Sequence, residues 1–572
     1  MFRQNQEHLQ IPMFSTVSSL PKAQRELLEK SWAGVFYHEL FCRLDEKPFA
    51  VLFSDEASRP NVPVNRLVAF DVLKAGFGWS DEEMYEAYLF NVQVRYALGL
   101  YDLGDDSFDL RTLYYFRHRL SEHMQTTGEN LIEKAFNQVT DQQIAAFHLK
   151  TDRLRMDTTF VSSNICQVSR LHLLVEMLQR VQRMLTETDR PRYGADFTNY
   201  VRGTAGQFMY HLRGQELAPH IEQVGVLMAR LVVDLAATYN QDDTYVLLER
   251  VFLEHFAFDQ SRVRVKTGAE LNAKTLQSPD DPEATYRNKR GERHVGYISN
   301  VTETCDPQNK MQLIVAMQTE KNTTDDTTLL AAALPSLKER TDVHELTTDG
   351  GFVGDAARRA TAEQQVQHVV TALRGAQPGV VPMGSFAISQ GSDGTPATIT
   401  CPFQQVVPLT SKHPERYLAH FDALQCALCP KAAHCPAQPL KRAPVRSMSL
   451  SLRDIGSAQQ QRAFLLRDTK SEPNLRVAIE GTISVLKRPF AAGQLPVRGL
   501  YRIASMMTGS AAMVNIRRIQ HYLRAQSTQE AQKAETTDAS AASLSSLSSF
   551  VSQITCFLGS LFIPKTSLCA QN

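Results

Sequence analysis

Three acidic residues, Asp157, Asp349 and Glu480, stand in sequence contexts that could place carboxylates at one reactive site. Glu480 lies in a segment whose apolar residues recur at helical spacing. On a helix, Arg476, Glu480 and Lys487 fall within roughly 40° of one another around the axis. A carboxylate between two cations suits a site that holds both a metal ion and a phosphate backbone.

The two aspartates lie in or directly after strand-like runs. Residues 151–165 alternate in polarity and predict a strand that carries Asp157, and Asp349 lies where a second such run enters a glycine turn. Taken alone, each acidic residue has an ordinary structural interpretation, as an edge-strand, turn or helix-surface carboxylate. Three carboxylates at one sheet edge could instead bind two divalent cations, which prefer carboxylate oxygens and promote phosphoryl displacement.

The elements that must position these residues follow a mixed order. Residues 1–150 are predicted to be helical, with a capping box at 80–83, and residues 166–258 return to helical periodicity after the strand of Asp157. The remaining elements alternate: strands are predicted at 294–302, 311–319 and 344–352, and helices at 326–334 (ending before Pro335), 354–363 and 473–488. The Ser/Ala/Thr-rich stretch 527–548 is predicted to be disordered.

The composition is that of an ordinary soluble protein, with 572 residues, 43% hydrophobic, and a formal net charge of zero. The charge is unevenly spread: residues 1–150 hold 15 Lys and Arg against 21 Asp and Glu, whereas residues 441–525 hold 15 against 4. The basic region that contains Glu480 suits a polyanion, although a solvated basic face has the same composition. No signal peptide or membrane span is visible, which favours a cytosolic, reducing location.

The nine cysteines are unevenly spread: Cys401, Cys426, Cys429 and Cys435 fall within 35 residues, and the other five are scattered. In a reducing compartment such clusters bind metal more often than they form disulfides. Four thiolates are a common structural zinc site, and His434 is a possible substitute ligand. The alternative is a set of buried or incidental cysteines in a proline-bounded loop.

Several short motifs occur in a fixed order: Met156-Asp-Thr-Thr159, Leu346-Thr-Thr-Asp-Gly-Gly351 and Arg476-x3-Glu480-x6-Lys487. In this order they resemble the DDE transposases of bacterial insertion sequences, and the resemblance extends over residues 60–525. The family usually carries a Tyr three positions before the Arg, where this chain has Pro473.

The resemblance implies an α/β fold with a ribonuclease H-like mixed-sheet core over residues 151–525. A helical insert at 166–258 and a cysteine-bearing insert at about 380–465 would interrupt this core. An all-helical N-terminal domain, 1–150, which could bind DNA ends, would precede it, and a low-complexity tail, 526–572, would follow.

The resemblance also implies a function. Asp157, Asp349 and Glu480 would be catalytic and bind Mg²⁺ or Mn²⁺, while Arg476 and Lys487 would hold DNA. The implied reaction is cleavage and strand transfer at the ends of an insertion sequence. The partners would be double-stranded DNA, as terminal inverted repeats and target, and a second copy in a synaptic complex. No membrane is involved, and the location would be the bacterial cytoplasm, on the chromosome.

Two other functions stay open. Pro473 and the long tail motivate a catalytically silent, zinc-containing DNA-binding protein that keeps the transposase fold. A metal nuclease of the same fold, which hydrolyses DNA without strand transfer, is the third hypothesis.

Overall fold

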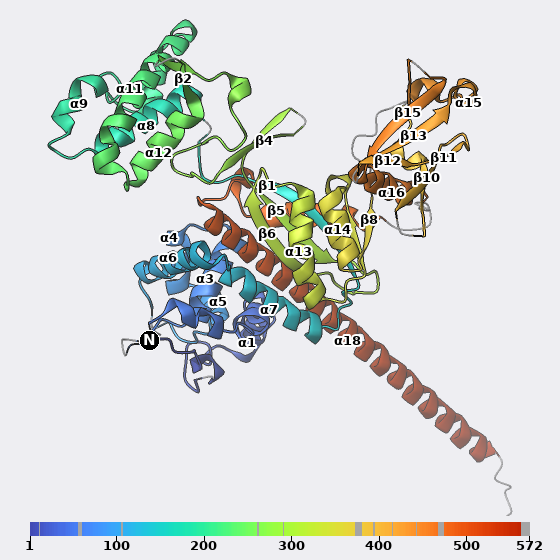
Figure 1. The fold of residues 1–572 in the computed structure, drawn as a ribbon. Coiled ribbons are helices and arrows are strands. Elements are labelled where there is room, and N and C mark those ends of the chain that lie inside the picture. Colours follow the sequence, from blue (N-terminus) through green and yellow to red (C-terminus); the bar gives the residue numbers. More distant parts are fainter. Residues whose placement is uncertain are drawn as a thin grey trace, which may run out of the picture.

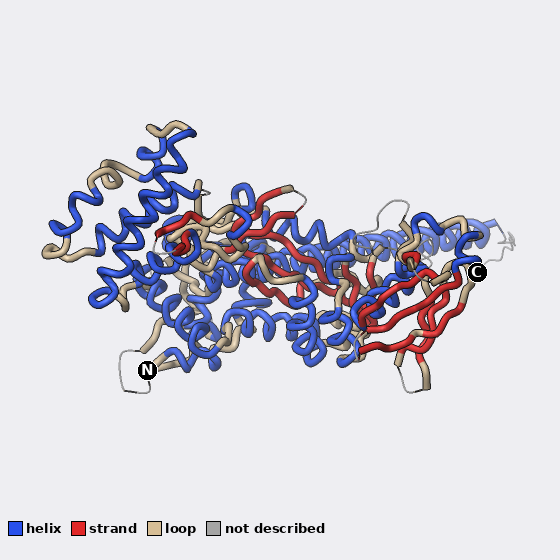
Figure 2. Tube along the Cα trace, turned by 45° about the horizontal axis from the view of Figure 1, so that its top comes forward, coloured by secondary structure: helices blue, strands red, loops and turns tan. Residues whose placement is uncertain are grey.

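The computed structural model of the chain describes residues 1–10, 12–54, 56, 60–103, 107–166, 168–259, 262–289, 291–371, 380–392, 395–413, 416–441, 443–466 and 474–561. Helices and a mixed sheet make up the fold, with the largest sheet near the centre of the molecule (Figure 2). The predicted α/β class is therefore confirmed at this level.

The described residues before the first strand contain only helices and turns. The α-helices are α1 (Lys22–Glu29), α2 (Trp32–Phe36), α3 (Val64–Phe77), α4 (Asp81–Phe90), α5 (Val92–Ala97), α6 (Leu110–Thr127) and α7 (Leu131–Ala146). The predicted capping box is confirmed: the Ser80 hydroxyl accepts from the Glu83 backbone N–H at 3.1 Å, and Glu83 accepts from the Ser80 N–H at 2.7 Å. These two bonds satisfy donors that a helix start leaves unpaired.

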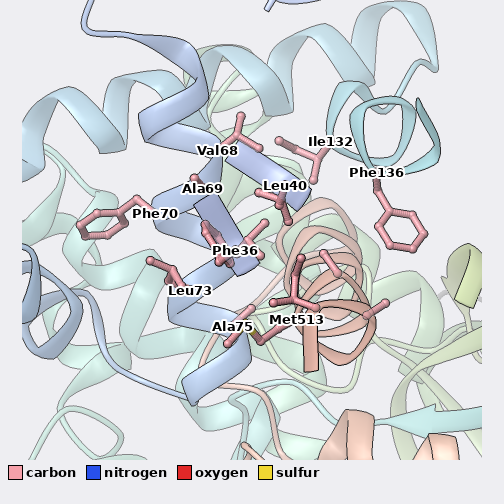
Figure 3. Close-up of a cluster of buried hydrophobic side chains, with 14 of the residues drawn as sticks. Phe36, Leu40, Val68, Ala69, Phe70, Leu73, Ala75, Ile132, Phe136 and Met513 are labelled. Atoms are coloured by element: carbon pink, nitrogen blue, oxygen red, sulfur yellow. The ribbon is translucent and has the colours of Figure 1, made fainter. Parts of the chain in front are cut away.

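Helix α3 is buried on nearly every side, and its neighbours include α18 (Leu500–Leu561). Figure 3 shows Val68 of this helix together with Phe36, Ile132 and Met513 from other helices. The Met513 side chain of α18 packs directly on Gly76 of α3, where a Cβ atom would lie 2.3 Å from Cγ of Met513. The N-terminal helices thus share one apolar core with the C-terminal helix and do not form a core of their own.

The central sheet has six strands: β1 (Arg153–Val161), β4 (Thr285–Lys289), β5 (Glu292–Thr304), β6 (Ile314–Lys321), β7 (Glu345–Thr348) and β8 (Gln367–Val370). Strand β5 lies next to β1, and β4 and β6 both pair with β5. Strand β5 is antiparallel to all three of these neighbours, whereas β1, β7 and β8 are parallel in succession.

Helices cover both faces of this sheet, as Figure 1 shows. On one face, Leu154 and Met156 of β1 pack against α13 (Asp326–Arg340) and α14 (Asp355–Glu363). On the other face lie α17 (Val477–Lys487) and α18. Because side chains alternate along a strand, Arg155 and Asp157 point to the α17 side.

The prediction that the helix starting at Asp326 ends before Pro335 is wrong, because α13 continues to Arg340. Proline lacks the N–H that would bond the carbonyl four residues earlier. Pro335 is exposed and Ala331, four residues earlier, is only half-buried, so water can reach this side of the helix.

Two inserted regions have apolar cores of their own. The first contains α8 (Arg170–Met184), α9 (Arg190–Phe197), α10 (Ala205–Tyr210), α11 (Leu217–Tyr239) and α12 (Asp243–His255), followed by the hairpin β2 (Phe256–Asp259) and β3 (Arg262–Val265). The second contains β9 (Ala387–Gln390), β10 (Pro396–Thr400), β11 (Val406–Pro408), β12 (Thr410–His413), β13 (Arg416–Asp422), α15 (Ala423–Ala427), β14 (Gln438–Pro439), β15 (Val445–Ser451) and α16 (Leu452–Leu466). They lie at opposite ends of the central sheet (Figures 1 and 2).

The prediction of disorder at 527–548 differs from the structure, in which α18 continues to Leu561. The segment contains Ala, Gln, Glu and Leu, which favour helix, and it has no proline. The far half of α18 extends away from the rest of the protein (Figure 1). Composition alone was therefore a poor guide to local structure here.

Candidate active site

Asp157 and Asp349 lie at the same edge of the sheet because their strands are parallel neighbours. Arg155 of β1 pairs with Thr347 of β7, and each aspartate lies two residues further along its strand direction. Asp157 is buried, and one of its carboxylate oxygens accepts from the Thr158 N–H at 2.8 Å. Asp349 caps the following turn by accepting from the Gly351 N–H at 2.8 Å.

The two carboxylates influence each other electrostatically. Burial raises the pKa of Asp157 above its ordinary value, the positive charge of Arg476 opposes this rise, and the negative charge of Asp349 adds to it. Repulsion between like charges in a poorly hydrated place is what a bound cation relieves.

Arg476 links Asp157 to Glu480. Its Nη2 atom donates to Asp157 Oδ2 at 2.8 Å, and its Nη1 atom lies 3.3 Å from Glu480 Oε1. Arg476 is the N-cap residue of α17, so Glu480 lies one turn along on the same face, as predicted. The Glu480 side chain is 62% exposed, which leaves its carboxylate free to move.

Lys487, at the other end of α17, reaches back to the strand of Asp157. Its Nζ atom donates to the Phe160 carbonyl at 2.9 Å and lies 3.4 Å from Thr159 Oγ1. Burial lowers the pKa of this ammonium group. The structure thus brings together all five residues for which the sequence predicted catalysis or DNA binding.

A buried ionic cluster fixes α17 against the sheet. Glu303 of β5 is fully buried and accepts from Arg155 Nε at 2.8 Å, from Thr482 Oγ1 at 2.9 Å and from Arg518 Nη1 at 2.7 Å. Arg155 also donates to the Leu475 carbonyl at 2.6 Å, directly before Arg476. The cluster therefore sets where Arg476 and Glu480 stand relative to Asp157.

Asp326, the first residue of α13, is a fourth carboxylate, for which the sequence analysis predicted no catalytic role. The cap position is Asp325, whereas Asp326 is buried and accepts from Thr158 Oγ1 at 3.3 Å. A Cβ atom on Gly351 would lie 2.7 Å from Asp326 Oδ2 and 2.9 Å from Asp349 Oδ1. Both oxygens therefore face the small space that this glycine leaves open.

The charge of Asp326 is coupled to the same site. Burial raises its pKa, the cations Arg287 and Lys289 oppose the rise, and the charge of Asp349 adds to it. The sequence signal that could have indicated Asp326 was the pair Asp325-Asp326 at the start of a helix that directly follows a strand.

The four clustered cysteines all line one small cavity in the second insert, beside Phe386 and Phe421. Burial raises the pKa of the Cys426 thiol, and the other three thiols raise it further. The Gln405 N–H donates to Cys401 Sγ at 3.4 Å. Among the described residues, no three His, Cys, Asp or Glu side chains are already arranged to hold a metal ion, here or at the carboxylates.

Two family models match the chain. One, described as "Transposase DDE domain", matches residues 399–520, and the other, described as "Transposase domain (DUF772)", matches residues 26–119. The first match spans Arg476, Glu480 and Lys487. The chain is a DDE transposase.

Other similarities are weaker. The transposase is similar to a solved structure titled "Cryo-EM structure of piggyBac transposase synaptic complex with hairpin DNA (SNHP)", with 10% identity over 86% of this chain and 75% of that chain. The TM-score is 0.26, which carries no information on the fold. No curated protein matches the chain.

The carboxylates of the transposase fit a hard divalent cation by the chemistry of their donors. Carboxylate oxygens are the ligands that Mg²⁺ prefers, and Asp157 and Asp349 repel one another. Arg476 now satisfies one oxygen of Asp157, so a cation there would have to share that oxygen or displace the guanidinium.

Across the part of the chain that the structure describes, no helix is both long and apolar enough for a bilayer span.

Proposed function

We propose that the transposase cleaves DNA at the ends of an insertion sequence and joins the freed 3′ hydroxyl to target DNA, with Asp157, Asp349 and Glu480 as its catalytic carboxylates. The observation that carries this proposal is their convergence. Two parallel strands end in the aspartates, and Arg476 links one aspartate to Glu480.

The strand order supports a ribonuclease H-like core. Strands β6, β5, β1, β7 and β8 lie side by side, and only β5 runs against the others. We therefore assign residues 151–525 to this core, with inserts at 166–258 and about 380–465. The helical region 1–150 would contact DNA ends, and 526–572 would be a separate tail.

Each residue has a role that follows from its place. Bound Mg²⁺ or Mn²⁺ would activate the attacking water or 3′ hydroxyl and stabilise the leaving oxygen. Asp157 and Asp349 would hold the ions from the sheet, and the exposed Glu480 would close over them from α17. Arg476 and Lys487 would hold phosphates of double-stranded DNA. Two ends would meet in a homodimer on the chromosome, in the bacterial cytoplasm.

The test is incubation of the purified protein with Mg²⁺ or Mn²⁺ and DNA that carries the ends of its own element. We expect nicks at the ends and joined products, both lost in EDTA. Specific end binding with intact DNA would instead establish the silent DNA-binding protein. Pro473, which motivates that alternative, lies outside the described residues. Cleavage without joined products would establish a nuclease.

Asp326→Asn is expected to raise the Mg²⁺ concentration needed for half-maximal cleavage by about 10- to 100-fold, as loss of a carboxylate that supports a metal ligand does. The reason is its position between Thr158 and Asp349. A titration of cleavage rate against Mg²⁺ measures the effect. Asp325→Asn is the matched control, because Asp325 is exposed and its side chain makes no capping bond. Equal Mg²⁺ dependence of both variants would restrict Asp326 to a structural role.

We also propose that Cys401, Cys426, Cys429 and Cys435 bind a structural zinc ion. The thiols line a common cavity, and thiolate ligands suit Zn²⁺. The insert around them is small, and zinc would add to the stability of its limited apolar core.

Purified protein is therefore expected to contain about one zinc ion per chain, and Cys426→Ser to lose it. Metal analysis measures the content directly, and thermal unfolding with a chelator shows whether the ion stabilises the fold. Cys166→Ser changes an exposed cysteine that lies outside the cysteine-bearing insert, and this variant should keep the zinc. Zinc-free wild-type protein whose unfolding temperature does not change on adding Zn²⁺ would disprove this site.

A further inference from the structure

The β4–β5 hairpin carries cations that gather around one aromatic ring. Phe160 of β1 stacks on the His294 ring, with centroids 4.1 Å apart and planes inclined by 14°. The Arg287 guanidinium lies 5.7 Å from the Phe160 centroid and the Lys289 ammonium lies 5.3 Å from it. Arg293 lies on the other face of the hairpin, 5.3 Å from the Tyr286 ring. We call Arg287, Lys289, His294 and Phe160 the hairpin platform.

The hairpin platform adjoins the carboxylates. Phe160 follows Asp157 by three residues on β1, so its side chain lies on the opposite face of the strand, together with Thr158 and the buried Asp326, while its carbonyl accepts from Lys487 Nζ. Burial lowers the pKa of His294, and the charges of Lys289, Lys487 and Arg287 lower it further, against the opposing effect of Glu292. The cations of β4 and α17 therefore surround one place beside the proposed catalytic site.

Most of this positive charge is not neutralised. Arg287 donates to the carbonyls of Asn322 and Thr324 at 3.2 and 3.1 Å, which hold the guanidinium without removing its charge. None of the described carboxylates forms an ion pair with Arg287, Lys289 or Arg293. The acidic groups that face the platform are the buried Asp326 and the largely exposed Glu292.

A solvated hairpin needs no such arrangement. Exposed cations at a strand end usually point apart into water, whereas here they converge on one aromatic ring. Cation–aromatic contacts fix the position of a positive charge without neutralising it. A row of fixed positive charges beside carboxylates matches a phosphodiester backbone, whose phosphates repeat along the strand.

We propose that the hairpin platform binds backbone phosphates of the DNA strand next to the one that is cleaved. This inference rests on the proposed function and adds a DNA-contact surface to it. The contact is with phosphate and not with base edges, so it holds the strand without reading its sequence. Because Lys487 contacts the backbone of Phe160 and belongs to the same helix as Glu480, the bound strand would run from β4 past the end of β1 towards α17.

The test is the salt dependence of binding to a short fluorescein-labelled duplex of unrelated sequence, without divalent cations. Each phosphate contact contributes about 0.9 to the slope of log affinity against log salt, so Lys289→Ala should lower the slope by about 1. Lys289→Arg should keep it. Lys289 is exposed, so the variant should fold.

Lys310→Ala is the matched control. Lys310 is also exposed, but it follows the other end of β5, and this 13-residue strand spans about 40 Å. We expect the control to bind like wild type. Equal slopes for wild type, Lys289→Ala and Lys310→Ala would overturn the inference and leave the proposed function intact. Failure of the wild type to bind any DNA would overturn both.

Discussion

Asp349→Asn is expected to slow metal-dependent DNA cleavage by about 10³-fold, since a metal centre supplies several kcal/mol of transition-state stabilisation and each 1.36 kcal/mol is tenfold. The substitution removes one negative charge from the proposed site. It keeps the side-chain oxygen that accepts the Gly351 N–H, so the turn should persist. The cleavage rate at saturating Mg²⁺ is the measurement. Asp157→Asn and Glu480→Gln should have losses of similar size.

The control for this prediction is Asp342→Asn. Asp342 is an exposed aspartate seven residues before Asp349, so its replacement changes net charge equally at a place away from the sheet edge. It should cleave at the wild-type rate. If Asp349→Asn also cleaved at that rate, with an unchanged unfolding temperature, then this carboxylate would have no part in the chemistry.

Glu303→Ala is expected to destabilise the protein by about 3–5 kcal/mol, the usual effect of breaking a buried ion pair. The substitution leaves Arg155 and Arg518 near each other without the anion between them. It also frees the Thr482 hydroxyl that ties α17 to β5. Denaturant unfolding monitored by tryptophan fluorescence measures the change. The tryptophans, Trp32 and Trp79, pack in the core that the N-terminal helices share with α18.

Glu270→Ala provides the comparison. Glu270 pairs with Arg264 at 2.8 Å at the exposed surface of the first insert, where water and salt screen the two charges, so the pair adds little to stability. We therefore expect a large decrease in the free energy of unfolding for Glu303→Ala and almost none for Glu270→Ala. A Glu303→Ala variant as stable as the Glu270 variant would mean that the ionic cluster does not hold α17 in place.

Sequence periodicity predicted the elements that carry the site because each has one face against the core. Strand β1 alternates, and α17 buries Ile479 and Leu486 on one side, so both patterns could be read without tertiary information. The predicted end of α13 and the predicted disorder at 527–548 were wrong where a local signal, Pro335 or a Ser/Ala/Thr-rich composition, was weaker than the surrounding helix.

The candidate site was predictable only in part. Asp157, Asp349 and Glu480 could be found from motif order, but nothing local links Arg155 to Glu303, which lies 148 residues away. Asp326 gave no catalytic signal either, because only the fold places it next to Asp349. Sequence therefore indicated the charged groups on single elements, whereas contacts between elements required the structure.

The central claim is that carboxylates such as Asp349 hold the metal ions that cleave DNA. Asp349→Cys tests it most directly, because a thiolate is a poor ligand for Mg²⁺ and a better one for softer Mn²⁺. Cleavage of element-end DNA should be lost with Mg²⁺ and return with Mn²⁺, whereas the wild type should cleave with either ion. Wild-type cleavage by Asp349→Cys with Mg²⁺ would contradict a metal-binding role for this residue.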